Sequence, residues 1–300
     1  VIDYIVKRRE SGGNVSADLT NSVSPLGFGN YQISGKYHYG KSSFTALAQW
    51  SRRDLEWNRE NEEMFYYPDK VITNRETVAA PNRIKYDYLN TSLNYNYTNG
   101  EKSMLNIAFR TDVKDIPYGF TDRNTILHQE NKEYEVKDRE QSETHIPSLD
   151  IYYQLNLKND QHLYFDVVGT YLKSNNQRTY SMTEVGQTPI EIFSKTEGDK
   201  YSMIGEAIYE RPLWKGKFTT GMKHNQATMD NVYDGDALTK VSMNTAETSF
   251  FAEYQSKVGK LNYTLGMGAL RTFYKQGNTS QEKYFFRPTL NLSYSLGKVF

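Results

Sequence analysis

Residues 148–172 read SLDIYYQLNL, KNDQ and HLYFDVVGTYL, and this stretch decides the fold of the chain. From Leu149 to Leu157 every odd-numbered residue is apolar or aromatic, whereas the even-numbered residues are mostly polar. The run from Leu163 to Tyr171 repeats the alternation after four polar residues. A period of two residues is typical of a β-strand with one apolar and one wet face. The stretch therefore predicts two strands joined by a short turn.

The same alternation recurs along nearly the whole chain, in runs that reach the roughly 9 to 11 residues of a membrane-spanning strand. Of the 300 residues, 37% are hydrophobic, and the mean hydropathy of −0.75 is low for an enzyme with a large buried core. No window approaches the roughly 18 apolar residues of a transmembrane helix, so the sequence excludes that class. A transmembrane barrel stays compatible, because every second residue of its strands faces a wet lumen.

Composition narrows the function classes further. Tyrosine is frequent, with 25 residues, and at a membrane surface its ring lies in lipid while its hydroxyl reaches water. The absence of cysteine excludes disulfides and thiolate chemistry. The formal net charge is zero, without the basic excess of a general nucleic-acid binder. We therefore predict no nucleic-acid partner.

Turn signals divide the chain into about twelve strands, joined alternately by short and long connections. The short connections are Gly40-Lys41, Asn99-Gly100, Lys158 to Gln161, Trp214-Lys215-Gly216 and Gly259-Lys260. The long ones run from Arg52 to Arg83, Lys114 to His145, Ser174 to Lys200, Gln226 to Thr245 and Gln276 to Lys283. This asymmetry is typical of an outer-membrane barrel, with tight periplasmic turns and long outer loops. We predict an all-β fold, an antiparallel transmembrane β-barrel of outer-membrane type.

Within each predicted strand, odd-numbered and even-numbered residues lie on opposite faces. The face expected to contact lipid includes Ile33, Tyr37, Phe44, Trp50, Leu93, Phe109, Leu149, Ile151, Phe165, Val167, Met203, Met222, Phe250, Leu265, Met267, Phe286 and Leu290. The opposite face is too polar for a protein core, and its charged residues are predicted to face the lumen: Arg110, Asp112, Glu206, Glu253 and Arg287. A soluble β-sandwich gives the same alternation, but its strands usually run only about 5 or 6 residues. Strand length and loop asymmetry favour the membrane barrel.

Two segments resemble TonB-dependent outer-membrane receptors. The run VIDYIVKR at residues 1–8, followed by Glu10-Ser11-Gly12-Gly13, is similar to the last plug strand and the step into the barrel, although Asp3 and Tyr4 depart from the pattern. The run RPTLNLSY at residues 287–294 is similar to a barrel strand of that family. The resemblance implies that residues 1–10 are the last strand of a plug domain and that residues 11–300 are barrel wall. A partial barrel, the first half of a larger one, is then expected; a complete twelve-stranded barrel ending at Phe300 is the alternative.

The resemblance also implies a function. Family members are ligand-gated importers in the outer membrane of Gram-negative bacteria, and they take up a siderophore, vitamin, glycan or peptide. The expected partners are outer-membrane lipid and lipopolysaccharide, the TonB complex acting through the plug, the nutrient ligand and a surface lipoprotein. The five charged lumen residues would contact the plug. No cofactor and no catalysis are expected, and a passive pore or structural twelve-stranded barrel stays open as an alternative.

A barrel hydrolase is a further alternative. The five histidines are His38, His128, His145, His162 and His224, and none lies in a Gly-x-Ser-x-Gly setting. No His-Glu-x-x-His pair occurs either. The sequence therefore predicts a protein that is not an enzyme.

One acidic run offers a weak metal candidate. Asp230, Asp234 and Asp236 surround a turn, but Val232 stands where a calcium loop needs an oxygen ligand. A solvated hairpin tip is the preferred interpretation. The charge-rich runs at residues 52–54, 59–63 and 132–143 mix both signs, which keeps long loops soluble and offers divalent-ion bridges to lipopolysaccharide.

Overall fold

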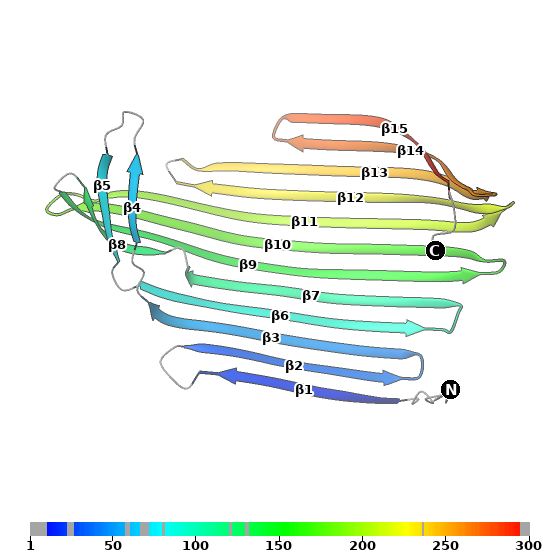
Figure 1. The fold of residues 1–300 in the computed structure, drawn as a ribbon, viewed down its shortest axis with the longest axis horizontal. Helices are drawn as coiled ribbons and strands as arrows, with labels where there is room; N and C mark the ends of the chain where they lie inside the picture. Colours follow the sequence, from blue (N-terminus) through cyan, green and yellow to red (C-terminus); the bar gives the residue numbers. More distant parts are fainter. Residues whose placement is uncertain are drawn as a thin grey trace.

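The computed structural model describes residues 11–22, 27–57, 61–66, 72–79, 82–119, 122–129, 132–235 and 237–294. In these ranges fifteen strands form one antiparallel sheet, as Figure 1 shows. The predicted all-β antiparallel fold is thereby confirmed. No helix in the described ranges is long and apolar enough to cross a membrane.

Twelve of the described strands lie side by side and are called the wall below. They are β1 (Ser11–Asn21), β2 (Phe28–Tyr39), β3 (Ser42–Trp57), β6 (Asn82–Thr98), β7 (Ser103–Tyr118), β9 (Lys132–Leu157), β10 (Gln161–Glu184), β11 (Ile190–Leu213), β12 (Gly216–Asp234), β13 (Thr239–Val258), β14 (Leu261–Gln276) and β15 (Thr279–Tyr294). Their number agrees with the prediction. Among the described strands β1 and β15 each have one neighbour, so the sheet is open rather than closed.

All five predicted short connections are turns, and they lie at one edge of the wall, called the turn edge (Figure 1). The backbones of Gly40 and Gly259 have φ values of 55° and 60°, a conformation that glycine adopts without the usual steric cost. The opposite edge is called the loop edge.

Three predictions about the loop edge are wrong. The segment from Gln226 to Thr245 is not a long loop, because β12 continues to Asp234 and β13 begins at Thr239. The segment from Ser174 to Lys200 is not a loop, because β10 continues to Glu184 and β11 begins at Ile190. The segment from Gln276 to Lys283 is a tight turn at Gly277, whose φ is 55°. The extensions of β10 and β11 are mostly polar, and their few apolar residues, among them Met182, Ile190 and Ile192, are too sparse to give the sustained alternation from which strands are recognised.

The three remaining strands are β4 (Asn61–Tyr66), β5 (Ile72–Ala79) and β8 (Arg123–Gln129), together called the flap. β8 pairs with the first part of β9, β5 pairs with β8, and β4 pairs with β5. In Figure 1 the flap crosses the strands at the loop edge of the wall. The sequence predicted the flap region as two long loops.

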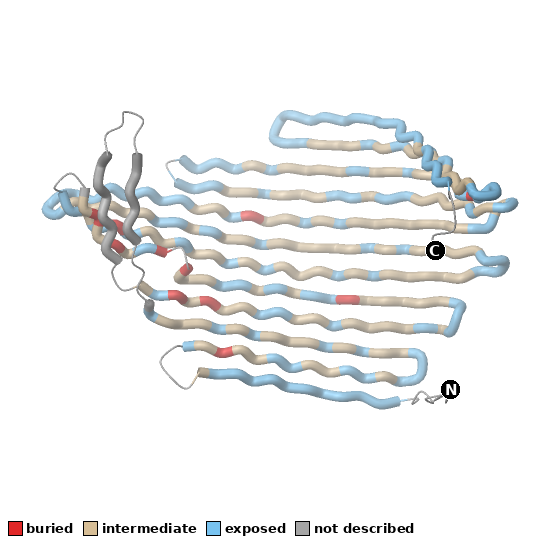
Figure 2. Tube along the Cα trace, viewed as in Figure 1, coloured by how far each residue is buried: buried red, intermediate tan, exposed pale blue. Residues whose placement is uncertain are grey.

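The small core of the molecule lies where the flap meets the wall. Ile84 and Leu127 are each 2% exposed, and Val136, Thr125 and Asp122 are also buried; Figure 2 shows several of the buried positions in this corner. By register, Leu127 faces the same side of β9 as Tyr134, and Thr125 the same side as Val136. Ile84, Thr125, Leu127 and Val136 share a face with the polar residues of the wall, so the flap folds toward that face.

The wall itself has no second layer among the described residues. Leu149, Ile151, Phe165 and Val167 are between 36% and 44% exposed. A two-layered sandwich, which would bury these four side chains, is therefore excluded for the described wall.

Candidate functional site

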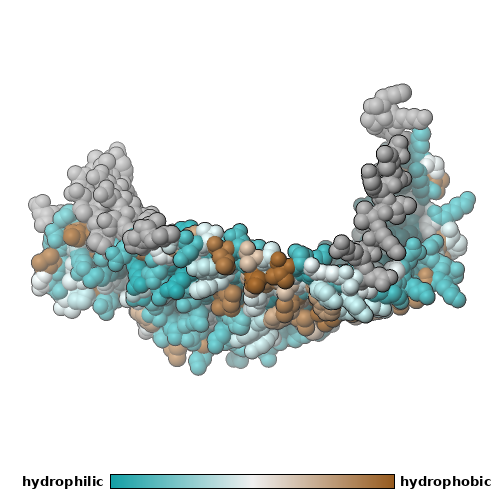
Figure 3. Space-filling view, turned by 90° about the horizontal axis from the view of Figure 1, so that it is seen from below, coloured by the Kyte–Doolittle hydropathy of each residue, from teal (hydrophilic) through white to brown (hydrophobic). Residues whose placement is uncertain are grey.

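The face of the wall that carries Leu149 and Ile151, called the apolar face, holds a continuous band of exposed apolar side chains. Cross-strand register aligns them in rows, for example Ile107, Ile151 and Val167 on β7, β9 and β10. Exposed members on other strands are Ile33, Phe44, Leu93, Phe109, Met203, Met222, Phe250, Leu265, Met267, Phe286, Leu290 and Leu292. In the edge-on view of Figure 3, apolar side chains gather mainly midway along the strands, between hydrophilic ends.

Aromatic side chains lie at both ends of this band. Toward the loop edge, Tyr31 packs on Trp50 with ring centroids 5.2 Å apart, and Tyr171 stacks on Tyr201 at 4.6 Å. Toward the turn edge, Phe44 packs on Tyr95 at 4.9 Å. Along β10 the band runs from Leu163 to Tyr171, eight residue steps or about 26 Å. The nine residues from Leu163 to Tyr171 agree with the roughly 9 to 11 residues of a tilted membrane-spanning strand, and such strands carry aromatic residues at both ends of the apolar stretch.

The opposite face, called the polar face, carries all five charged residues predicted for the lumen. Arg110 and Asp112 lie on β7, Glu206 on β11, Glu253 on β13 and Arg287 on β15. The register connects them as one face: Glu206 is opposite Asp166 and Lys223, whereas Glu253 is opposite Thr219. The structure thus places the five on one side of the sheet but spreads them over its width.

The polar face also contains a shallow hollow of about 300 Å³ that sequence reasoning did not single out. It is lined by Tyr152, Tyr164, Asp166, Glu206, Ile208 and Glu210. Lys217 donates a hydrogen bond to Glu210 at 2.9 Å, which balances one of the carboxylates. Tyr152 and Asp166 were already on the wet parity of the opening stretch. Their proximity to Glu210 follows only from the pairing of β10 with β11.

Charged side chains concentrate beyond the band, at the loop edge. Arg83 donates two hydrogen bonds to Asp54, at 2.7 and 2.9 Å, and these bonds lower the pKa of the Asp54 carboxyl. Arg139 lies over the ring of Tyr118 with its guanidinium carbon 4.2 Å from the centroid. Arg178 makes an equivalent two-bond pair with Asp138. The predicted charge-rich loops are therefore partly ordered by ion pairs between strands.

Asp122 is the buried acid of the flap corner, with an exposed fraction of 4%. Burial raises the pKa of its carboxyl, although a hydrogen bond from the Glu140 backbone N–H to Oδ1, at 2.8 Å, opposes this effect. Its backbone carbonyl accepts a hydrogen bond from Asn82 Nδ2 at 2.6 Å. Asp122 thus connects the turn before β8 to both β6 and β9.

The weak metal candidate is not assembled by the described residues. Asp230 and Asp234 lie four residues apart on the extended strand β12, which separates them by roughly 13 Å. Asp236 lies outside the described residues. Across the described ranges, no group of three acidic or histidine side chains is arranged to hold a metal ion.

The histidines take part in separate local contacts. His145 bonds Thr111, His162 bonds Asn156 and His224 bonds Thr248, at 3.1, 2.8 and 2.7 Å. His128 lies 3.7 Å from Glu133. His224 shares the apolar face with Met222, whereas His162 belongs to the polar face. These placements do not bring the four together in one site.

Comparison with family models, with curated proteins and with solved structures gives no match to this chain.

Proposed function

We propose that the wall is part of an outer-membrane β-barrel and that the protein takes part in TonB-dependent uptake of a nutrient. The observation that carries the proposal is the exposed apolar band, which is flanked by aromatic rows and backed by a polar face. In water, an apolar surface across a whole sheet favours aggregation. In a bilayer the same surface contacts hydrocarbon, and the polar face borders an aqueous interior.

The flap favours a gated route over an open pore. The core beneath it is formed by Ile84 of β6, Leu127 of β8 and Val136 of β9, which all belong to the polar face, at the loop edge. In a closed barrel that position is the outer mouth of the lumen, so the flap narrows the entrance. A narrowed mouth is suited to selective capture of a ligand before transport. Siderophores, vitamins, glycans and peptides are the substrate classes that the family resemblance supplies.

The energy for transport would come from the TonB complex acting through a plug. The support for this step is the resemblance of residues 1–8 and 287–294 to TonB-dependent receptors. Residues 287–294 belong to β15, whereas residues 1–10 lie outside the described residues. The barrel also requires partners for the free edges of β1 and β15, because unpaired backbone groups are not tolerated in hydrocarbon.

Reconstitution tests the membrane placement. The whole gene product is folded into phospholipid vesicles and digested with protease, and the protected fragments are identified by mass spectrometry. We expect protection of the band on every wall strand and cleavage at the loop edge. Uniform cleavage throughout the wall would contradict the proposal.

Two further measurements separate transport from the alternatives. Planar-bilayer recordings of the whole gene product should show no steady conductance if a plug closes the lumen, and a steady conductance if the protein is a passive pore. Purified TonB C-terminal domain should bind the gene product in detergent. Absence of binding together with a steady pore would replace the uptake proposal with the passive one.

A further inference from the structure

A hollow of about 450 Å³ lies on the polar face at the loop edge, where the flap strand β8 joins β9 and β10. It is called the mouth hollow, and it is lined by Arg123 of β8, Asp138 and Glu140 of β9, and Arg178 and Tyr180 of β10. Its volume falls in the range of about 300–1,000 Å³ that small-molecule sites occupy. Along β10, Arg178 follows Tyr171 by seven residues, or about 23 Å, so the mouth hollow lies outside the apolar band.

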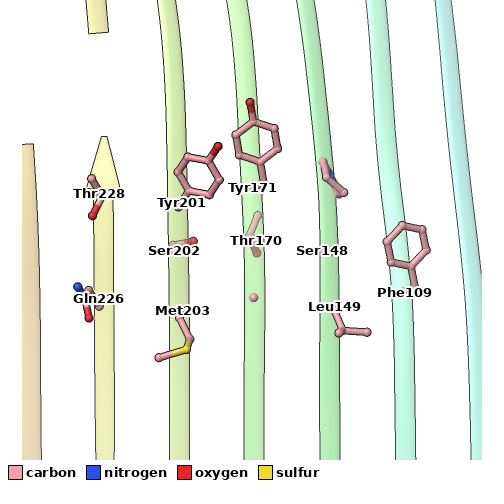
Figure 4. A pocket seen from close by; sticks show the side chains of 12 residues that line it. Phe109, Ser148, Leu149, Thr170, Tyr171, Tyr201, Ser202, Met203, Gln226 and Thr228 are labelled. Carbon is pink, nitrogen blue, oxygen red and sulfur yellow. The ribbon is translucent and has the colours of Figure 1, made fainter. Parts of the chain in front are cut away.

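The lining of the mouth hollow is hydrophilic except for the face of one phenol ring. The hollow on the apolar face that Figure 4 shows is different, because its lining includes Phe109, Leu149 and Met203. The five described side chains of the mouth hollow include no purely apolar one. An apolar ligand would leave their donors and acceptors without water or partners, which costs free energy. The mouth hollow therefore requires a ligand that forms hydrogen bonds over most of its surface.

The charges of the lining residues cancel, because two guanidinium groups face two carboxylates. Outward on the same face of β10, the next charged side chain is Glu184, which lies 3.1 Å from the ammonium nitrogen of Lys132. Inward, the next two rows on β9, β10 and β11 are neutral: Ser142, Asn176 and Thr196, then Thr144, Ser174 and Gly198. Lys114 of β7 ends the second of these rows and lies over the ring of Tyr88. This balance favours a neutral ligand over an anion or a cation.

The mouth hollow offers donors and acceptors side by side next to an aromatic ring. Asp138 takes two of the five N–H donors of Arg178, at 2.8 and 2.7 Å, which leaves three for a ligand. The hydroxyl of Tyr180 lies 3.9 Å from the sulfur of Met182, a weak acceptor. The exposed Ile192, opposite Tyr180 on β11, widens the apolar patch of the ring. Neighbouring hydroxyls of a sugar both donate and accept, as a guanidinium beside a carboxylate requires, and the C–H face of a sugar ring fits an aromatic ring.

We propose that the mouth hollow binds a neutral glycan. The proposal rests on the uptake function proposed above and names its substrate class. One sugar ring lies on Tyr180, and its hydroxyls bond the guanidinium of Arg178 and the carboxylate of Asp138. The following sugar residues lie along the two neutral rows toward the band, where Ser142 donates a hydrogen bond to Asn176 at 2.8 Å.

The test begins with the labelled whole gene product, folded in a detergent without a sugar head group, on an array of neutral, uronic-acid and sulfated glycans. Neutral glycans should bind. The neutral glycan with the strongest signal is then titrated by calorimetry. Arg178→Gln and Tyr180→Ala should each weaken its binding on the order of tenfold, because one loses the paired hydrogen bonds and the other the ring. Tyr180→Phe keeps the ring and should lose only about threefold.

Arg83→Gln is the matched control. Arg83 also makes two hydrogen bonds to an aspartate at the loop edge, but it does not line the mouth hollow. It should bind the glycan like the wild type. The proposal is overturned if Arg178→Gln and Arg83→Gln bind alike, if Tyr180→Ala binds like the wild type, or if the array shows only acidic glycans or none.

A separate outcome concerns uptake itself. If the gene product binds the TonB domain but no neutral glycan, only the substrate class is refuted. If it binds the neutral glycan through Arg178 and Tyr180 but not the TonB domain, the glycan site is supported and the uptake proposal is refuted.

Discussion

The wall and the flap corner differ in how far their apolar side chains are buried. Ile84 and Leu127 at the flap corner are nearly inaccessible, as in an ordinary protein core. Leu149 and Val167 in the middle of the wall are more than 40% exposed although they belong to the longest strands. The flap can be stable by its own packing, whereas the apolar face of the wall requires an apolar surrounding. Under the proposed membrane placement the sheet depends on two solvents, water around the flap corner and hydrocarbon along the apolar face.

The largest effect is expected from Leu127→Ala in the flap. The change leaves a cavity in a packed corner, which typically costs about 2–5 kcal/mol. We expect limited proteolysis to cut the flap in the variant but not in the wild type, in vesicles. Leu149→Ala in the wall is the control, because lipid chains fill the space that the removed side chain leaves. Equal protease sensitivity of the two variants would remove the distinction between packed corner and lipid-facing wall.

The next effect concerns a charge in the apolar band. Ile151→Lys places an ammonium group midway along β9, where contact with hydrocarbon costs about 2–4 kcal/mol. Urea titration of the protein folded in vesicles should show a lower unfolding midpoint, corresponding to a free energy of unfolding reduced by that amount. Gln154→Lys on the polar face of the same strand should change the midpoint little. If both lysines act alike, the two faces do not differ in their surroundings.

A smaller effect is expected at Asp122. Asp122→Ala removes the carboxyl that accepts the part-buried hydrogen bond from the Glu140 N–H, which costs about 1 kcal/mol. Asp122→Asn keeps an acceptor oxygen and should protect the flap. Because burial raises the pKa of Asp122, the flap of the wild type should lose stability as pH rises through that raised pKa. Hydrogen exchange of β8 amides, corrected for intrinsic rates, measures this; a pH-independent wild type would contradict it.

The smallest effect should come from the Asp54–Arg83 pair. Its hydrogen bonds lower the pKa of Asp54 below the ordinary 3.8, so its stabilisation is present above pH 3.8 and is lost as pH falls through the lowered pKa. The loss is small, since both side chains are partly exposed and solvent screens the pair. Unfolding midpoints of the wild type and Asp54→Asn should converge in acid. A constant difference between them would show that the pair does not titrate with folding.

Individual residues show which features of the structure could be predicted from the sequence. Alternation placed Leu149, Ile151, Phe165 and Val167 on one face, and the structure has them there. It also placed Glu206 and Glu253 together on the opposite face. Alternation did not reveal the flap, because β4, β5 and β8 fall within stretches that were predicted as long polar loops.

The sequence by itself determined the strands of the wall, their turns at one edge and the separation of an apolar from a polar face. Side chains alternate across every strand, so the face of each residue follows from local order alone. Only the tertiary structure decided that Ile84 and Leu127 share a core, that Asp166 lies near Glu210, and that Tyr171 stacks on Tyr201. Those relations depend on the register between separate strands, and a shift of one residue would exchange every face.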